Sequence, residues 1–201
     1  MSADSEWKTV KTKMWARIKE IEKAVPNYDY SSLHSIISTD DKFTDFVLSE
    51  LRKSKKILFD ILENSYEQQK EMLTKDVQKI RDDIDIFLDN VKIRQIRWPE
   101  KIPEEFLEKI VFHDSELLRE IPKMNSLLEE IEKNVLEMEK PGTSLFDKEQ
   151  LEKLNAKISN AKSQAEFLFR LFKERDLLLN LKHIHREDVY EETKSEIETR
   201  F

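Results

Sequence analysis

The sequence predicts an all-α protein, an elongated antiparallel helical bundle with coiled-coil-like heptad packing. The first observation is composition: the 201-residue chain contains one glycine, Gly142, and 38% of its residues are charged. Because glycine supplies the positive-φ turns and close backbone approaches of other folds, a chain that nearly lacks it is suited to helices. The second observation is a repeated spacing: in three separate segments, apolar residues alternate at steps of four and three without an error. That spacing is typical of helices that pack side by side as in coiled coils.

Residues 1–25 are expected to form an amphipathic helix. Apolar residues recur there at steps of three and four: Trp7, Val10, Met14, Ile18, Ile21 and Val25. Pro26 ends this pattern, because a proline drives the residue before it out of the helical region. The polar residues 26–40 are then expected to form a linker, and residues 39–41 offer N-caps for the next helix.

The bundle itself is expected over residues 41–183, and it begins with a segment that has no proline or glycine as far as Ile96. The apolar stripe of this segment fades across residues 64–69, where Ser65 and Gln68 fit a capping box. One continuous helix, roughly 80 Å long, and two helices joined by a turn both fit this pattern.

The next helix is expected to begin at Pro103 and to run to about residue 139. Proline is favoured in the first turn of a helix, and the two glutamates that follow suit the positive end of the helix dipole. The apolar stripe consists of Leu117, Ile121, Met124, Leu128, Ile131, Val135 and Met138. Pro122 lies inside this stripe, so we expect it to kink the helix or to divide it into two collinear pieces.

Residues 141–144 contain the one firm turn signal of the chain, and the last helix is expected to start near Asp147. The stripe of this helix ends in residues 167–181, which have too many apolar side chains for a single face. A helix that is apolar nearly all round is buried on most sides. We therefore expect either the N-terminal helix or another polypeptide to cover its second face. Residues 184–201 are expected to form an acidic tail.

Charge and composition argue against several classes of protein. A net charge of −7 is unfavourable for a protein that wraps nucleic acid, so no nucleic-acid partner is expected. The chain has no cysteine, which excludes disulfides and thiolate catalysis. No apolar run approaches the roughly 20 residues of a membrane span, and the first residues lack the apolar core of a signal peptide. We expect an intracellular protein, in the cytoplasm, with the nucleus as an alternative.

The motifs of common catalytic sites are missing from the sequence. One glycine cannot form a phosphate-binding loop. None of the four histidines follows a glutamate at the spacing of a di-iron bundle site. We therefore expect no enzyme, no catalytic residue and no cofactor.

Two aspartate pairs are candidates for a metal site. Asp41 with Asp45, and Asp85 with Asp89, each place two carboxylates on one helix face, where oxygen ligands suit a hard cation. Solvated helix faces carry such pairs as well. Acidic pairs of this kind are similar to those of PhoU-like phosphate regulators, but the matching place in the last helix reads Lys162…Glu166, so no family is assigned.

Aromatic and leucine side chains are the candidates for partner binding. Trp7 and Trp15 lie among lysines on the N-terminal helix, a combination found in helices that dock into partner grooves or lie on anionic membranes. Trp98 follows the first long segment, and tryptophan is enriched in interface hot spots. The candidates in the last helix are Phe167, Phe169, Leu171 and Leu178. For each tryptophan, packing within the bundle is the alternative.

These features predict a non-catalytic interaction or adaptor subunit, which acts through coiled-coil packing in a homo-oligomer or a multiprotein complex. A peripheral membrane protein that uses the tryptophan-containing N-terminal helix is one alternative. A metal-dependent regulator built on the aspartate pairs is another.

Overall fold

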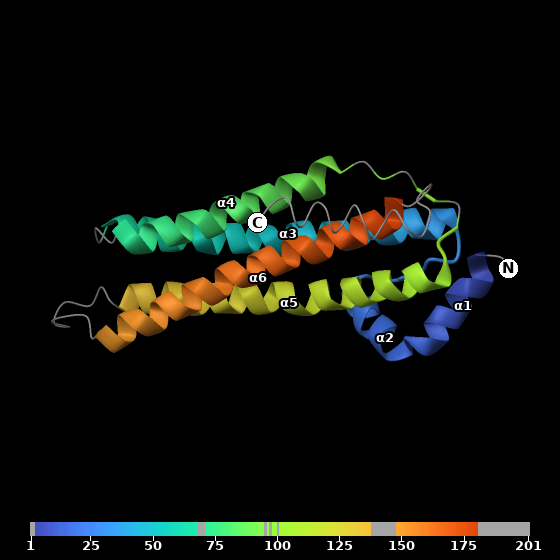
Figure 1. Cartoon of the computed structure of the whole chain (residues 1–201), viewed down its shortest axis with the longest axis horizontal. Helices are drawn as coiled ribbons and strands as arrows, with labels where there is room; N and C mark the ends of the chain where they lie inside the picture. The colour runs from blue at the N-terminus through green and yellow to red at the C-terminus, as the bar shows by residue number, and fades with distance from the viewer. Residues whose placement is uncertain are drawn as a thin grey trace, which may run out of the picture.

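The computed structural model describes residues 3–67, 71–94, 96, 98–99, 101–137 and 148–180 (Figure 1). The residues in these ranges form six helices and no strand, which confirms the predicted all-α class. The helices are α1 (Ala3–Lys13), α2 (Trp15–Ala24), α3 (Leu33–Glu67), α4 (Glu71–Ile93), α5 (Glu104–Glu137) and α6 (Lys148–Asn180). The predicted turn at 141–144, the helix start at Asp147 and the acidic tail at 184–201 lie outside the described residues.

Helices α3 to α6 form a four-helix bundle in which successive helices run antiparallel (Figure 1). Lys55 of α3 pairs with Asp85 of α4 at 2.6 Å. Helix α5 lies beside α3, and α6 lies between α4 and α5. The α3–α5 and α4–α6 pairs run parallel (Figure 1). The predicted antiparallel arrangement therefore holds for successive helices but not for every pair of neighbours, and α4 and α5 occupy opposite corners of the bundle.

The long segment that begins the bundle forms two helices, so the second of the two expected arrangements is found. Helix α3 ends at Glu67 and α4 begins at Glu71. Ser65 does not cap α4, because its hydroxyl donates a hydrogen bond to the carbonyl of Ile61 inside α3 at 2.6 Å. The loss of the apolar stripe, rather than a capping box, is therefore the sequence feature that coincides with the break.

Helix α3 starts at Leu33, so residues 33–40 belong to this helix and the predicted linker is too long. The hydroxyl oxygen of Ser32 accepts a hydrogen bond from the N–H of Ser35 at 3.2 Å, which is the geometry of an N-cap. These residues resemble a linker in sequence because the first turns of α3 bury polar groups. Thr39, for example, is buried and accepts a hydrogen bond from the N–H of Asp29 at 3.0 Å.

The N-terminal segment forms two helices instead of the single one expected. Met14 separates them with φ −111° and ψ 22°. Its N–H still donates to the carbonyl of Val10 at 2.8 Å, and its own carbonyl accepts from the N–H of Ile18 at 3.0 Å. The chain therefore bends at Met14 while hydrogen bonds continue across the bend. Both α1 and α2 pack on α5.

The apolar stripes predicted from the sequence form one continuous core. Residues from all of them are buried, including Val10 and Ile18 from the N-terminal helices and Leu51, Leu128 and Leu168 from the bundle. Along the described part of the chain, no helix is both long and apolar enough to cross a bilayer.

Pro122 lies within a single helix, because α5 runs without interruption from Glu104 to Glu137. Division of this helix into two pieces is therefore not found. The proline has no N–H to donate to the carbonyl of Leu118, and its ring crowds that carbonyl.

Replacing Pro122 by alanine should raise the free energy of unfolding by up to about 3 kcal/mol, because the change restores a donor and removes a steric clash. Urea unfolding followed by circular dichroism measures the change. Ser126→Ala, an exposed substitution one turn later in α5, is the control and should change stability by at most about 0.5 kcal/mol. A loss of stability in Pro122→Ala would show that the proline ring itself fills part of the core.

Candidate interaction site

Trp7 is a core residue. Only 3% of its side chain is exposed, and its ring lies 5.5 Å from the ring of Tyr30 and 6.0 Å from that of Tyr28. Both tyrosines belong to the chain that joins α2 to α3. The aromatic cluster therefore fixes the N-terminal helices to the bundle, and Trp7 is not available to a partner in this arrangement.

Trp15 has the opposite environment, although it lies only eight residues further along the chain. As the first residue of α2 it stands at the bend after Met14, and 59% of it is exposed. Lys11 and Lys19, one turn before and one turn after it, are exposed as well. Among the candidate binding residues identified from the sequence, Trp15 is the one that presents a large aromatic side chain to solvent.

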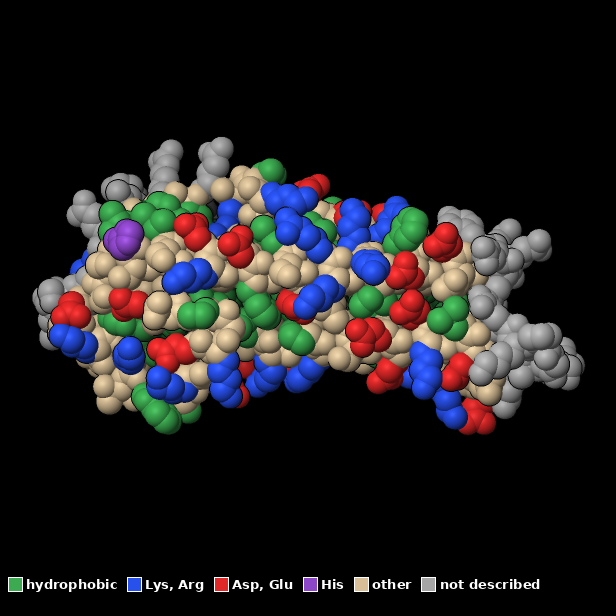
Figure 2. All heavy atoms as spheres, turned by 180° about the vertical axis from the view of Figure 1, so that it is seen from behind, with side chains coloured by type: hydrophobic (Ala, Val, Ile, Leu, Met, Phe, Trp, Pro, Cys, Tyr) green, Lys and Arg blue, Asp and Glu red, His purple; other side chains and the backbone are tan. Residues whose placement is uncertain are grey.

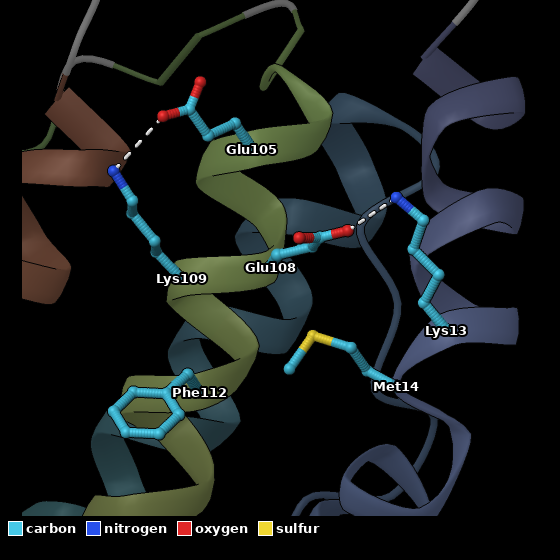
Figure 3. A pocket seen from close by; sticks show the side chains of 6 residues that line it. All are labelled: Lys13, Met14, Glu105, Glu108, Lys109 and Phe112. Carbon is cyan, nitrogen blue, oxygen red and sulfur yellow. Dashed lines mark hydrogen bonds and ion pairs between the residues drawn. The ribbon is translucent and has the colours of Figure 1, made fainter.

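A groove lies between the end of α1 and the first turns of α5 (Figure 3). It has a volume of about 500 Å³ and is lined by Lys13, Met14, Glu105, Glu108, Lys109 and Phe112. Met14 and Phe112 form its apolar part, and 41% of Phe112 is exposed. Ion pairs border it: Lys13 with Glu108 at 2.9 Å and Lys109 with Glu105 at 3.4 Å. The groove therefore combines an apolar floor with charged sides of both signs.

The four candidates in α6 face the protein's own bundle. Leu171 and Leu178 are buried, and Phe167 and Phe169 are partly buried against the core. The ring of Phe169 lies 5.2 Å from that of Phe87 in α4. The second apolar face of α6 was expected to be covered by the N-terminal helix or by another polypeptide. At Phe169 it is covered by α4 instead. Trp98 is also partly buried against the core.

A buried ion network lies inside the bundle and centres on Arg175 of α6, which has no exposed surface. The Arg175 guanidinium donates to Asp114 of α5 through Nε and to Asp40 of α3 at 2.6 Å through Nη1. The same carboxylate of Asp114 accepts hydrogen bonds from the hydroxyls of Tyr28, at 2.6 Å, and Tyr30, at 3.2 Å. The network thus joins three bundle helices to the chain segment that follows α2.

Arg94 extends this network from the end of α4. Its guanidinium donates to Asp176 at 2.7 Å and also to Asp40 and Thr44. Its Cζ lies over the ring of Phe172, 5.5 Å from the ring centroid. Helices α3, α5 and α6 and the residue that follows α4 therefore each contribute a charged group to one cluster.

The buried charges perturb one another strongly. Burial lowers the pKa of Arg175, but Asp114, Tyr30 and Asp40 raise it more, so that pKa lies well above its usual range. Burial raises the pKa of Asp114, although Arg175 and the Tyr28 hydroxyl oppose the change. Burial also raises the pKa of Tyr28 well above its usual range, and Asp114 adds to the effect. Arg175 therefore stays charged and the tyrosines stay protonated, which suits a network that holds helices together rather than one that exchanges protons.

Sequence analysis did not identify this network as a candidate site. Arg175 and Asp114 occupy positions that continue the apolar stripes of α6 and α5, each three residues from the nearest stripe residue, Phe172 and Leu117 respectively. A charged residue at a core position is the signal that reveals such a network, because an ion there must be paired. The positions were predictable, but the choice of partners depends on which helices are neighbours.

His113 lies next to the network in sequence and is mostly buried between α5 and α6. Its Nδ1 is buried and has no hydrogen-bond partner among the described residues, and its Nε2 lies 3.9 Å from a carboxylate oxygen of Glu174. Burial lowers the pKa of His113, and Arg175 lowers it further, while Glu174 opposes the change. The folded protein therefore favours the neutral imidazole.

The contribution of His113 to stability should decrease as the pH falls below about 6.5, because the unfolded chain then binds a proton at His113 more readily than the folded chain does. Above that pH, the stabilisation from neutral His113 is fully present. This stabilisation is lost as the pH falls through the lower pKa that His113 has in the folded state. His113→Gln should reduce the difference in unfolding free energy between about pH 7.5 and pH 5.5, by about 1.4 kcal/mol for each pH unit between the two pKa values. The raised pKa values of four carboxyl groups act in the opposite direction in both proteins, so the comparison isolates His113; these groups are Asp83, Asp114, Glu132 and Asp176. Equal pH dependence would contradict this assignment.

The aspartate pairs do not come together in a metal-binding cluster. Asp41 and Asp45 are exposed on α3. On α4, Asp85 pairs with Lys55 at 2.6 Å and Asp89 pairs with Lys92 at 3.3 Å. Within the described ranges, no group of three or more histidine, aspartate or glutamate side chains could hold a metal ion.

Comparisons with protein-family models, with curated proteins and with solved structures find no match for this chain.

Proposed function

We propose that the protein is a non-catalytic helical interaction subunit and that its contact with a protein partner is centred on Trp15. The observation that carries the proposal is the 59% exposure of this side chain at the bend between α1 and α2. Exposing a tryptophan forgoes the burial of a large apolar surface. Tryptophan is also the residue type most enriched in interface hot spots.

The surroundings of Trp15 support a protein contact. Lys11 and Lys19 can form a polar rim around it, and Met14, which precedes it in the chain, lines the groove between α1 and α5. A hot spot of this kind needs an apolar centre and a rim that excludes water. Figure 2 shows positive and negative side chains interspersed over the back of the molecule, with small apolar patches between them.

Co-purification of the full chain from its native cell tests the proposal. Trp15→Glu should reduce recovery of the partner about tenfold or more, which corresponds to a loss of at least about 1.4 kcal/mol in binding. Phe59→Glu is the matched control, because Phe59 is 56% exposed on the separate helix α3, and it should leave recovery unchanged. Sedimentation equilibrium of the purified variants detects the case in which the partner is a second copy. Equal recovery with both variants would contradict the assignment of Trp15.

An anionic membrane surface is a second candidate, and the lysines that flank Trp15 are the observation that favours it. The apolar stripe of α1 and α2 is buried against α5, so a membrane would contact Trp15 and the lysines rather than an inserted amphipathic face. Vesicles that contain phosphatidylserine should then shift the tryptophan emission of the wild type to shorter wavelength but not that of Trp15→Phe. No binding to such vesicles, together with partner recovery, would favour the protein contact.

A further inference from the structure

Pro122 weakens the hydrogen-bond ladder in the middle of α5. The proline cannot donate to the carbonyl of Leu118, and sharp bends in helices occur most often at prolines. It separates a first part of α5, which carries Asp114 of the ion network, from a second part, which continues to Glu137. The contact of Asp114 with Arg175 therefore anchors the part of α5 that precedes the proline, and the second part needs an anchor of its own.

A buried polar cluster, which consists of Glu50, Ser54 and Asn125, ties the second part of α5 to α3. Asn125 follows the proline by three residues, and its Oδ1 accepts a hydrogen bond from the Ser54 hydroxyl at 2.5 Å. Its Nδ2 donates to the backbone carbonyl of Glu50 at 3.3 Å and to the carboxylate of Glu50 at 3.1 Å. Ser54 and Asn125 are both buried. The cluster therefore joins the two helices inside the core.

The cluster interrupts an apolar stripe. Ser54 lies between Leu51 and Leu58 at steps of three and four, so it occupies a core position of α3. An apolar side chain there would bury more apolar surface, and replacing both partners of a buried hydrogen bond by apolar groups of the same shape can be nearly neutral or stabilising. Buried polar residues among apolar neighbours can instead specify one alignment of the helices that carry them. A role in alignment therefore explains the cluster better than a role in stability.

Helix α6 holds α5 on the other side of the proline. Gln164 of α6 donates from its Nε2 to the carbonyl of Glu120 at 3.2 Å. Polar contacts from two neighbouring helices therefore flank Pro122: one precedes it by two residues, and the other follows it by three. Loss of the polar cluster releases the contact that follows the proline and leaves the contact of Gln164 in place.

We propose that Pro122 is a hinge in α5 and that the polar cluster is the latch that holds this hinge in one position. The inference is independent of the proposed role of Trp15. When the latch is closed, Asn125 keeps the second part of α5 beside α3. When the latch is open, this part pivots at the proline and moves away from the end of α3. The helix from Pro122 to Lys133 is about 17 Å long, so an added bend of about 20° moves Lys133 by about 6 Å.

Distances between two spin labels test the proposal, because the natural chain has no cysteine. Labels at Glu63→Cys on α3 and Lys133→Cys on α5 occupy exposed positions, and double electron–electron resonance measures the distribution of distances between them. The labelled chain with an intact latch should give a single distance. Adding Ser54→Ala and Asn125→Leu removes the latch and keeps the branched shape of the asparagine side chain. This variant should show a second population that is shifted by about 6 Å.

Ser65→Ala in the same labelled chain is the matched control. Ser65 is as buried as Ser54 and lies on the same helix, but its hydroxyl donates within that helix, to the carbonyl of Ile61. The control should therefore leave the distance distribution unchanged. A second population of the same size in the control would overturn the proposal, because loss of any buried hydroxyl would then produce it.

A further substitution tests the position of the pivot. Adding Pro122→Ala to the latch-free variant restores the ladder of α5 and should reduce the second population about tenfold or more. Ser54→Ala alone keeps the bonds between Asn125 and Glu50, so it should show a smaller second population and serves if the double substitution impairs folding. A single unshifted distance in both latch variants would overturn the proposal, as would a second population that persists unchanged after Pro122→Ala.

Discussion

Replacing Arg175 by alanine should lower the free energy of unfolding by about 3–5 kcal/mol, because the change leaves two carboxylates buried without their cation. Asp40 and Asp114 are both completely buried and both accept hydrogen bonds from this guanidinium. Tyr30 also loses a donor, since Arg175 Nη2 donates to its hydroxyl at 3.3 Å. Urea unfolding followed by circular dichroism measures the loss.

Arg170→Ala is the matched control for this experiment. Arg170 lies on the same helix, is exposed, and is 4.0 Å from Glu174, so its replacement should change stability by at most about 1 kcal/mol. Arg175→Lys should remain clearly destabilised, because an ammonium group cannot reproduce the fixed fork of a guanidinium. Stability in Arg175→Ala equal to that of the control would mean that water or neighbouring groups compensate the two carboxylates.

Replacing Trp7 by alanine should cost about 3–5 kcal/mol, as expected for the removal of a buried aromatic side chain. The ring packs on Tyr28 and Tyr30, and those tyrosines donate to Asp114. The substitution therefore creates a cavity and loosens the aromatic contacts that position two donors of the ion network. Thermal and urea unfolding of the full chain measure the effect.

Trp15→Ala is the matched control, because it also replaces a tryptophan by alanine in the N-terminal helices. Because 59% of Trp15 is exposed, its replacement should change stability by at most about 0.5–1 kcal/mol. Similar losses in the two variants would show that Trp15 packs against the bundle in solution. A small loss in both would mean that α1 and α2 contribute little to the stability of the bundle.

The fold class and the positions of the long helices could be predicted because the spacing of apolar residues directly records which face of a helix is buried. The start of α3 could not be predicted in the same way, since Thr39 and Asp40 are buried through polar partners that belong to other segments. A pattern based on apolar residues interprets such positions as solvent-exposed.

The sequence pattern also could not predict which helices are neighbours in the bundle. The excess of apolar side chains in α6 correctly indicated a second buried face, but periodicity does not say which element covers it. The contact between Phe169 and Phe87 is made because α6 lies beside α4. The different environments of Trp7 and Trp15 follow from the way α1 and α2 lie on α5. Their sequence positions restrict them to different parts of the helix surface but do not identify the surface that packs.

The position of Arg175 also has a consequence for the order of events in folding. Its partners Asp40 and Asp114 are separated from it by 135 and 61 residues. The α3–α4 and α5–α6 hairpins can form from contacts that are closer in sequence, which costs less loop entropy. Neither hairpin alone contains the complete set of charges, since Asp40 and Arg94 belong to the first and Asp114 and Arg175 to the second. Each half holds one Asp–Arg pair of its own, but the ion pairs of Arg175 with Asp40 and of Arg94 with Asp176 form only when the halves dock. These pairs between the halves therefore form late and depend on correct pairing of the hairpins.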